Sequence, residues 1–342
     1  MRKGTRRMAA AIGCLTLLFG MAACKSEAGE NKVTEPPVAT ETPEPTATPE
    51  PTATPVPTAT PVPTKAPAKI EDEEIPNEYR KLNKDFFGTV EYIDYQTYDY
   101  FGDGAEFTKH AYVYLPPEYD ENKQYDVLYL MHGIGGDEKE WGIHNTFSTV
   151  RLALDNLIYY GEAKPFIVVV PNGRSTNGTH SGAFYLFGQE LRNDLIPYID
   201  SHYATYAEYD PDGYDLTAAR DHRAMAGLSM GGMQTINIGL CECLDIMSYF
   251  GAFSAAPTSN SAATIAEKLK DFEEYDIHYF YNICGLSDGT ALASARGAVT
   301  GLDALTDKLT EGENFMWQPV KGIHDFYVWN LGFYNFAQLV FQ

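Results

Sequence analysis

A serine flanked by glycines is the most chemically suggestive feature of this chain. Residues 226–232 read Ala-Gly-Leu-Ser-Met-Gly-Gly and fit the pattern G-x-S-x-G around Ser229. A short apolar run that can end a strand precedes Ser229, and residues 233–240 have helical character. A strand that turns directly into a helix leaves room only for small residues beside the serine. The pattern predicts a nucleophilic serine at a helix N-terminus, where free N–H groups and the positive dipole end can stabilise an oxyanion.

A nucleophilic serine of this kind needs a histidine as base, and the chain order in proteins with this turn is serine, acid, histidine. Of the chain's eight histidines only His278 and His324 follow Ser229. His278 is expected inside a strand that begins at residue 277, where its side chain is locked into a sheet. His324 is expected on a loop directly after a strand, from which it can reach the serine. The sequence therefore predicts His324 as the base.

An acid should orient the histidine, and Asp288 directly follows the carboxyl end of an expected strand. Three other candidates are expected at solvated helix positions and two in connections remote from strand carboxyl ends; these are Asp271, Asp303 and Asp307, and Asp245 and Asp276. Asp325 adjoins His324 and is badly placed to orient its ring. The predicted catalytic set is Ser229, Asp288 and His324.

A glycine-rich loop follows the third expected strand. Residues 132–136 read His-Gly-Ile-Gly-Gly and resemble the HGGG-type loop of esterases. Glycines there allow backbone N–H groups to approach a substrate closely. The backbone N–H groups of Met230 and Ile134 are the predicted oxyanion donors, the second of them within one residue. His132 itself is expected to be a structural hydrogen-bonding residue.

The elements that must position these residues alternate between strands and helices. Strands are expected at 88–98, 108–115, 126–132, 166–170, 223–226, 248–254, 277–284 and 315–320. Helices are expected at 147–160, 184–202, 233–240, 262–272, 294–309 and from 326 onward. The first two strands alternate polar and apolar residues, as at an antiparallel sheet edge. The order predicts an α/β architecture with a mostly parallel central sheet and helices on both faces. Together with the G-x-S-x-G turn it indicates an α/β-hydrolase fold.

The N-terminal part of the chain is expected to be an export and attachment segment. Residues 1–23 combine four basic residues with a mostly apolar run, as in a signal peptide, and Met21-Ala22-Ala23-Cys24 resembles a bacterial lipobox. Cleavage before Cys24 would place lipid on its thiol; the alternative is an ordinary signal peptide. Residues 24–70 contain more than half of the chain's 20 prolines and are expected to be a disordered Pro/Thr-rich linker. The predicted domain is 71–342, lipid-anchored at the bacterial cell surface.

Composition limits the partners. The chain has 342 residues, 44% of them hydrophobic, and a formal net charge of −22. An acidic surface repels nucleic acid, anionic lipid and anionic polysaccharide, so neutral partners are favoured and no nucleic acid is expected. No spacing of Cys, His and carboxylates predicts a metal site, and no cofactor is expected. Cys241, Cys243 and Cys284 form an odd set with no obvious disulfide framework.

Four segments together resemble the feruloyl esterases of carbohydrate esterase family 1, which are related to esterase D. They are 132–136, 226–232, the Gly-Leu-Ser-Asp of 285–288 and the Gly-Ile-His-Asp-Phe-Tyr-Val-Trp of 322–329. The resemblance covers about residue 91 to the C-terminus and implies hydrolysis of feruloyl or acetyl esters on plant xylan, with Ser229, Asp288 and His324 as the triad.

Two further residues are candidates for substrate binding. Trp141 matches a tryptophan of similar feruloyl esterases and is expected to offer a flat face to an aromatic acyl group or a sugar, the alternative being a core residue. His180 lies in the polar loop 173–184, which is expected to border the cleft. An acetyl xylan esterase, or another small-acyl carboxylesterase, is the second interpretation. A catalytically silent surface binding protein is the third.

Overall fold

The computed structural model of the protein describes residue 70 and residues 72–342. Its centre is an eight-stranded sheet in the order β1-β2-β4-β3-β5-β6-β7-β8. The first two strands pair antiparallel, β2 pairs antiparallel with β4, and all remaining pairs are parallel. The strands are β1 (Thr89–Tyr98), β2 (Glu106–Leu115), β3 (Asp126–Met131), β4 (Phe166–Pro171), β5 (Arg223–Leu228), β6 (Tyr249–Phe253), β7 (Tyr279–Gly285) and β8 (Phe315–Val320).

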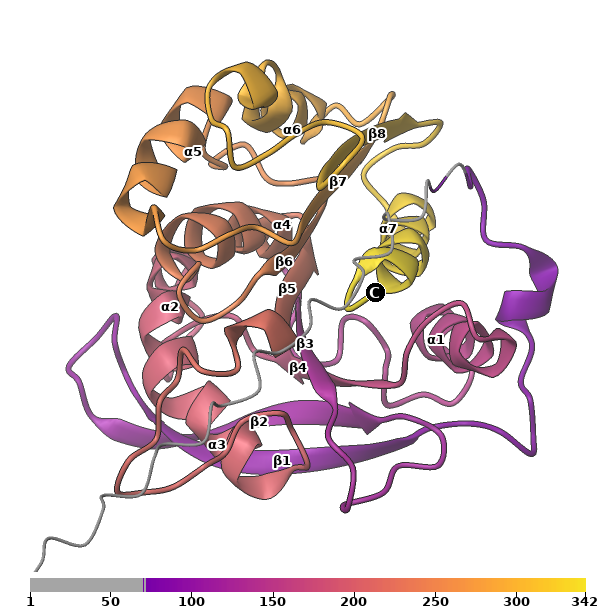
Figure 1. The fold of residues 1–342 in the computed structure, drawn as a ribbon, viewed down its shortest axis with the longest axis vertical. Helices are drawn as coiled ribbons and strands as arrows, with labels where there is room; N and C mark the ends of the chain where they lie inside the picture. Colours follow the sequence, from indigo (N-terminus) through magenta and orange to yellow (C-terminus); the bar gives the residue numbers. More distant parts are fainter. Residues whose placement is uncertain (1–69, 71) are drawn as a thin grey trace, which may run out of the picture. The chain divides into compact units, whose positions relative to one another are not determined.

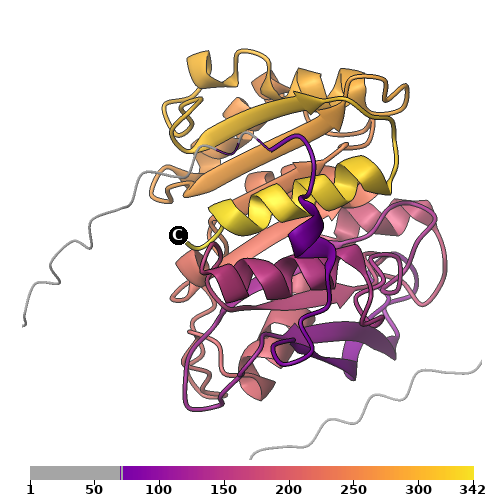
Figure 2. The ribbon, with the colours of Figure 1, turned by 90° about the vertical axis from the view of Figure 1, so that its right-hand side faces the viewer.

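Helices cover both faces of the sheet (Figure 1). On one face lie α1 (Thr149–Tyr160) and α7 (Phe326–Leu339), which stand in front of the strands in Figure 2. On the other face lie α2 (Phe187–Glu190), α3 (Ile196–His202), α4 (Met230–Gln234), α5 (Ala262–Lys268) and α6 (Leu292–Val299). Two π-helical turns, Leu191–Leu195 and Thr235–Leu240, and 3₁₀ turns at Asn77–Arg80, Ser181–Leu186, Arg220–His222, Leu269–Phe272 and Leu302–Ala304 complete the regular structure. The expected mostly parallel, two-sided α/β architecture is confirmed.

The sequence explains the central strands and the helix ends. Every residue of β3, β4 and β5 is buried, as their dense apolar composition requires for strands covered on both faces. Ser148 caps α1 by accepting a hydrogen bond from Arg151 N–H, and Gly161 ends that helix at φ 75°, a conformation that favours glycine. Asp325 caps α7 in the same way, accepting from Tyr327 N–H.

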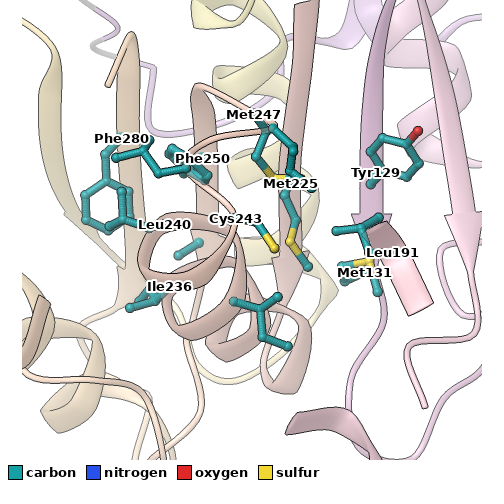
Figure 3. Packing of buried hydrophobic residues seen from close by; sticks show 14 of the residues in the cluster. Tyr129, Met131, Leu191, Met225, Ile236, Leu240, Cys243, Met247, Phe250 and Phe280 are labelled. Atoms are coloured by element: carbon teal, nitrogen blue, oxygen red, sulfur yellow. The ribbon is translucent and has the colours of Figure 1, made fainter. Parts of the chain in front are cut away.

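The core under the helices α2 to α6 is one continuous cluster (Figure 3). Met131, Met225, Phe250 and Phe280 project from neighbouring strands, and Leu191 with Ile236 and Leu240 covers them from the π-helical turns. A second cluster lies under α1 and α7 on the opposite face. Every residue of β3 to β7 is buried, so these strands form a well-packed support for the residues at the carboxyl edge of the sheet.

Two expectations about elements are wrong in detail. The helix expected over 294–309 ends at Val299, because Thr300 is extended and Gly301 is left-handed at φ 69°. Leu302, at the start of the 3₁₀ turn Leu302–Ala304, and Leu309 are nevertheless buried, so part of the apolar pattern that predicted a longer helix is packed without one, whereas Leu305 is exposed. His278 lies just before β7 and not inside it. Among the described residues, no helix combines the length and the apolar character needed to cross a membrane. The predicted signal peptide, Cys24 and the linker up to residue 69 lie outside the described residues.

Candidate active site

Ser229 occupies a sharp turn between β5 and α4. Its backbone has φ 51°, a left-handed conformation that is rare for a residue with a side chain. A Cβ atom at Gly231 would lie 2.5 Å from the carbonyl oxygen of Met131, and one at Gly227 would lie 2.7 Å from the backbone of Gly231. The turn packs so closely against β3 that only glycine fits at these positions. This arrangement is the strained turn predicted from the G-x-S-x-G pattern.

His324 and Asp288 meet Ser229 at the carboxyl edge of the sheet. His324 Nε2 lies 3.0 Å from Ser229 Oγ, and His324 Nδ1 lies 2.8 Å from Asp288 Oδ2. The other oxygen, Asp288 Oδ1, accepts hydrogen bonds from the backbone N–H groups of Thr290 and Ala291. The structure thus brings the three predicted residues together in one hydrogen-bonded chain.

The pKa of Asp288 determines where the protons lie in the hydrogen-bonded chain Ser229–His324–Asp288. Burial alone would raise the pKa of Asp288, but the hydrogen bonds from His324 and from the Ala291 N–H outweigh it and hold the pKa below its ordinary value. Asp288 is therefore ionised near neutral pH and accepts the Nδ1 proton of His324. The neutral ring then has its Nε2 lone pair free to accept the hydroxyl proton of Ser229.

The rejected candidates lie elsewhere. His278 sits at the amino end of β7, the edge of the sheet opposite to Ser229, and its Nδ1 lies 3.1 Å from the hydroxyl of Tyr249. Asp325 is committed to the N-terminus of α7. Elimination by position in the chain therefore selected the histidine that reaches the serine.

The glycine-rich loop after β3 runs beside Ser229. A Cβ atom at Gly133 would lie 3.5 Å from that of Ser229. The Gly133 N–H already donates to Glu140 Oε2 at 2.6 Å, so it is not free for a substrate. The next N–H groups, those of Ile134 and Gly135, make no hydrogen bond to any other described residue. Met230 is the first residue of α4, so its N–H has no acceptor within the helix.

Arg174 holds this loop from the outside, and sequence reasoning did not find it. Its Nη1 donates to the carbonyl of Gly136 at 2.8 Å and its Nη2 to the carbonyl of Ile134 at 2.5 Å, while the guanidinium lies 4.7 Å from the ring centre of Phe184. The side chain is only 8% exposed. Its backbone is in turn fixed, because Lys109 Nζ donates to the carbonyl of Arg174. A single arginine in the otherwise uncharged loop 172–182 was the available signal.

His132 has the structural role expected of it. It is fully buried, its Nδ1 lies 2.7 Å from the carbonyl of Gly133, and its Nε2 accepts from the N–H of Gly173 at 2.8 Å. Burial lowers the pKa of His132 to about 4, so the ring is neutral and joins the two loops beside the serine.

Comparison with known proteins gives the family. The sequence pattern of the Esterase family matches residues 107–330, about two thirds of the chain. The chain belongs to the Esterase family. Within residues 70 and 72–342 this esterase shows no group of three His, Cys, Asp or Glu side chains placed to hold a metal ion.

The relatives of the esterase include xylan-degrading enzymes. It is 36% identical over 208 residues to endo-1,4-beta-xylanase Y of Acetivibrio thermocellus. The matched segment covers 59% of this chain and 18% of the relative. It is 31% identical over 242 residues to endo-1,4-beta-xylanase/feruloyl esterase of Xylanibacter ruminicola, which covers 68% of this chain and 29% of the relative. The esterase therefore spans less than a third of the length of these curated relatives.

The solved structures that are similar include a feruloyl esterase module from Clostridium thermocellum, a serine-to-alanine mutant complexed with sinapinate. The TM-score is 0.67 at 28% identity, over 81% of this chain and 96% of that one. A CE1 ferulic acid esterase from Anaeromyces mucronatus, in complex with ferulic acid, gives 0.62 at 25% identity, over 80% and 98%. The α/β-hydrolase fold and the resemblance to feruloyl esterases of carbohydrate esterase family 1 are confirmed.

The two residues predicted to contact substrate fare differently. Trp141 is only 3% exposed, donates from Nε1 to the carbonyl of Met131, and packs edge-on against Phe253 and Phe326. It is a core residue, and the expectation that it offers an open face to substrate is wrong, because its side chain is buried against aromatic side chains of β6 and α7. His180 is exposed, caps the turn Ser181–Leu186, and stacks on Phe101 at 4.3 Å between ring centres. Its role toward substrate stays a prediction.

Proposed function

We propose that this esterase hydrolyses hydroxycinnamoyl esters, feruloyl esters above all, carried by plant xylan or arabinoxylan. The hydrogen-bonded chain Ser229–His324–Asp288 carries the proposal, since it supplies a nucleophile and a base at the edge of an α/β-hydrolase sheet. The similarity to a feruloyl esterase module complexed with sinapinate supports the choice of acyl group.

In the proposed mechanism Ser229 Oγ attacks the ester carbonyl carbon while its proton passes to His324 Nε2. Asp288 stabilises the imidazolium that forms and keeps Nδ1 protonated. His324 then gives the proton to the leaving sugar oxygen, which leaves the acyl group on Ser229. Water attacks the acyl-enzyme with His324 again as base. The bond between Ser229 Oγ and the acyl carbon then breaks, His324 returns the proton to Ser229 Oγ, and the free acid departs.

The charge that develops on the carbonyl oxygen needs donors that are already in place. We assign this role to the N–H groups of Met230 and Ile134. Neither donates to another described residue, and the carbonyl of Ile134 is held by Arg174, which restricts the orientation of its loop. No metal ion or cofactor takes part in the proposed reaction.

The deciding experiment compares two esters with the purified enzyme. Hydrolysis of methyl ferulate with weak release of acetate from acetylated xylan is the expected result. Release of acetate from acetylated xylan with weak hydrolysis of methyl ferulate would show that the protein is an acetyl xylan esterase instead. Failure on both esters and on p-nitrophenyl acetate would leave only a binding protein.

We also propose that the mature protein is a lipoprotein, attached through Cys24 to a bacterial cell surface and acting on neutral polysaccharide outside the cell. The lipobox-like sequence at 21–24 and the net charge of −22 support this. Cys24→Ser should release the protein from membranes, or block its maturation, without changing catalysis. Mass spectrometry that finds a different, unmodified N-terminus would exclude the anchor.

A further inference from the structure

A concave feature lies beside the oxyanion loop, at the edge of the sheet. It is a groove of about 170 Å³ between the start of β2 and the loop after β4, lined by residues 107–110, Glu138, Asn172 and residues 176–178. Drug-sized ligands occupy pockets of about 300 Å³ or more, so this groove fits a smaller group. Asn172, in the groove lining, has its Oδ1 3.3 Å from Nε2 of His132, so the groove adjoins the loop that carries a proposed oxyanion donor.

The sheet itself creates the groove. β4 pairs with β2 only as far as Pro171, which lies opposite Ala111. β2 continues for five more residues, Glu106–His110, still paired with β1 on its other side. Alternate backbone N–H and C=O groups on the side that faces the groove therefore have no partner strand and can bond to hydroxyl groups.

The charged side chains of the groove already have partners. Glu138 Oε1 accepts a hydrogen bond from the Tyr92 hydroxyl at 3.4 Å and lies 3.6 Å from Lys139 Nζ. Lys109 Nζ donates to both oxygens of buried Glu190 and to the carbonyls of Asn172 and Arg174. His110 Nδ1 lies 2.6 Å from Asp94. The remaining side-chain groups are mostly hydroxyl and amide, from Thr108, Thr176, Asn172 and Asn177. Such a lining suits a neutral, hydroxyl-rich ligand and not an anion.

An aromatic surface continues from the groove. Tyr92 is 49% exposed, stacks on His110 at 5.1 Å between ring centres, and directs its hydroxyl to Glu138. Tyr112 adjoins Tyr92 and stacks on His144. We call Tyr92, His110, Tyr112 and His144 the β1–β2 aromatic surface. Exposed rings beside hydrogen-bonding groups provide both contacts that a sugar ring uses, an apolar face and polar edges.

We propose that the groove and the β1–β2 aromatic surface bind the sugar chain that carries the ester, adjacent to the esterified sugar. This inference rests on the proposed function for the identity of the chain, a neutral arabinoxylan. The residues at the sheet edge would thus recognise the polysaccharide, whereas other residues would bind the acyl group and form the triad.

Binding is tested without catalysis. Ser229→Ala protein is titrated calorimetrically with an unesterified arabinoxylo-oligosaccharide, alone and with Tyr92→Ala or Asn177→Ala added. The expected result is measurable binding that weakens by about fivefold or more when Tyr92 is removed, as loss of an aromatic contact implies. No binding at millimolar sugar, or equal binding by parent and both variants, overturns the proposal.

Kinetics provide a second test with a matched control. Tyr206 is also an exposed tyrosine stacked on a histidine, His222, but it lies near the amino end of β5, away from the groove. The ratio of kcat/KM for a feruloylated arabinoxylo-oligosaccharide to kcat/KM for methyl ferulate should fall in Tyr92→Ala, mainly through KM. It should not change in Tyr206→Ala. If this ratio is the same in Tyr92→Ala as in the parent, the proposal that the groove binds sugar is contradicted. If the parent does not hydrolyse methyl ferulate, the proposed function is contradicted instead.

Discussion

Ser229, His324 and Asp288 lie in one hydrogen-bonded chain, so their contributions to catalysis should not add. Ser229→Ala or His324→Ala should each lower kcat for methyl ferulate by about 10⁴-fold or more, and the double variant should be little worse. Steady-state kinetics on the three proteins, with circular dichroism as a folding control, measures this. Near-normal turnover in Ser229→Ala would falsify the scheme.

Arg174 should act through position and not by touching the ester. With its side chain removed, the carbonyls of Ile134 and Gly136 lose their donors and the oxyanion loop can turn away from Ser229. Arg174→Ala should lower kcat by up to about 10²-fold, the scale of losing one oxyanion donor, with a smaller change in KM. Arg174→Lys should recover only part of the loss, because an ammonium lacks the fork that reaches two carbonyls.

Two inhibitors distinguish a positioning role of Arg174 from a purely structural role. Affinity for an arylboronic acid, which mimics the tetrahedral intermediate, should fall with kcat, while affinity for ferulate, the planar product, should change little. Parental kcat in a folded Arg174→Ala protein, or equal loss of affinity for both compounds, would contradict the assignment.

At the scale of elements, the turn between β5 and α4 limits which side chains fit beside Ser229. In Gly231→Ala the new Cβ would lie 2.5 Å from the backbone carbonyl of Met131, and backbone of a central strand cannot move aside. We expect a loss of about 1–3 kcal/mol in the free energy of unfolding and a large loss of activity. Gly297→Ala is the matched control: its Cβ would meet nothing within 4 Å in α6, so stability should rise by up to about 1 kcal/mol. Urea denaturation compares the two, and equal stability of both variants would disprove the steric argument.

At the scale of the whole molecule, His132 makes the free energy of unfolding depend on pH. Its pKa is about 4 in the folded protein against an ordinary 6.5, so protonation favours the unfolded chain. The contribution is fully present above pH 6.5 and is lost as pH falls toward 4, by about 3 kcal/mol in total. In His132→Gln this titration is absent, so the stability difference between parent and variant should shrink by that amount from pH 7 to 4. A difference that is constant with pH would show that His132 does not titrate as described.

The segment before β1 belongs to the folded unit. Ile70, Ile75 and Tyr79 are buried in the cluster under α1 and α7, and Gln318 and Asn335 donate to the carbonyl of Asp72. A chain that begins at residue 89 loses these side chains, each contributing about 1.5–3 kcal/mol when fully buried. It should be much less stable to urea than a chain that begins at residue 70. Equal denaturation midpoints would show that the segment only rests on the surface.

Local spacing was enough to predict most of the active site. Glycines around Ser229, the order of serine, acid and histidine, and the place of Asp288 after a strand are constraints that neighbouring residues impose on one another. Alternating strands and helices likewise predict a parallel sheet, because each pattern reflects which faces of its own element are buried.

Contacts between distant segments required the tertiary structure. The sequence indicates that 172–182 is a polar loop, but only the fold places Arg174 against the carbonyls of residues some 40 positions earlier. The same packing buries Trp141 against rings of β6 and α7, which its own neighbours in sequence do not reveal. The segment after Val299 buries Leu302 and Leu309 through a 3₁₀ turn and a loop, although their spacing predicted a continuous α-helix. Sequence patterns record the periodicity of an element, whereas the partner that covers each side chain is decided by how the elements pack.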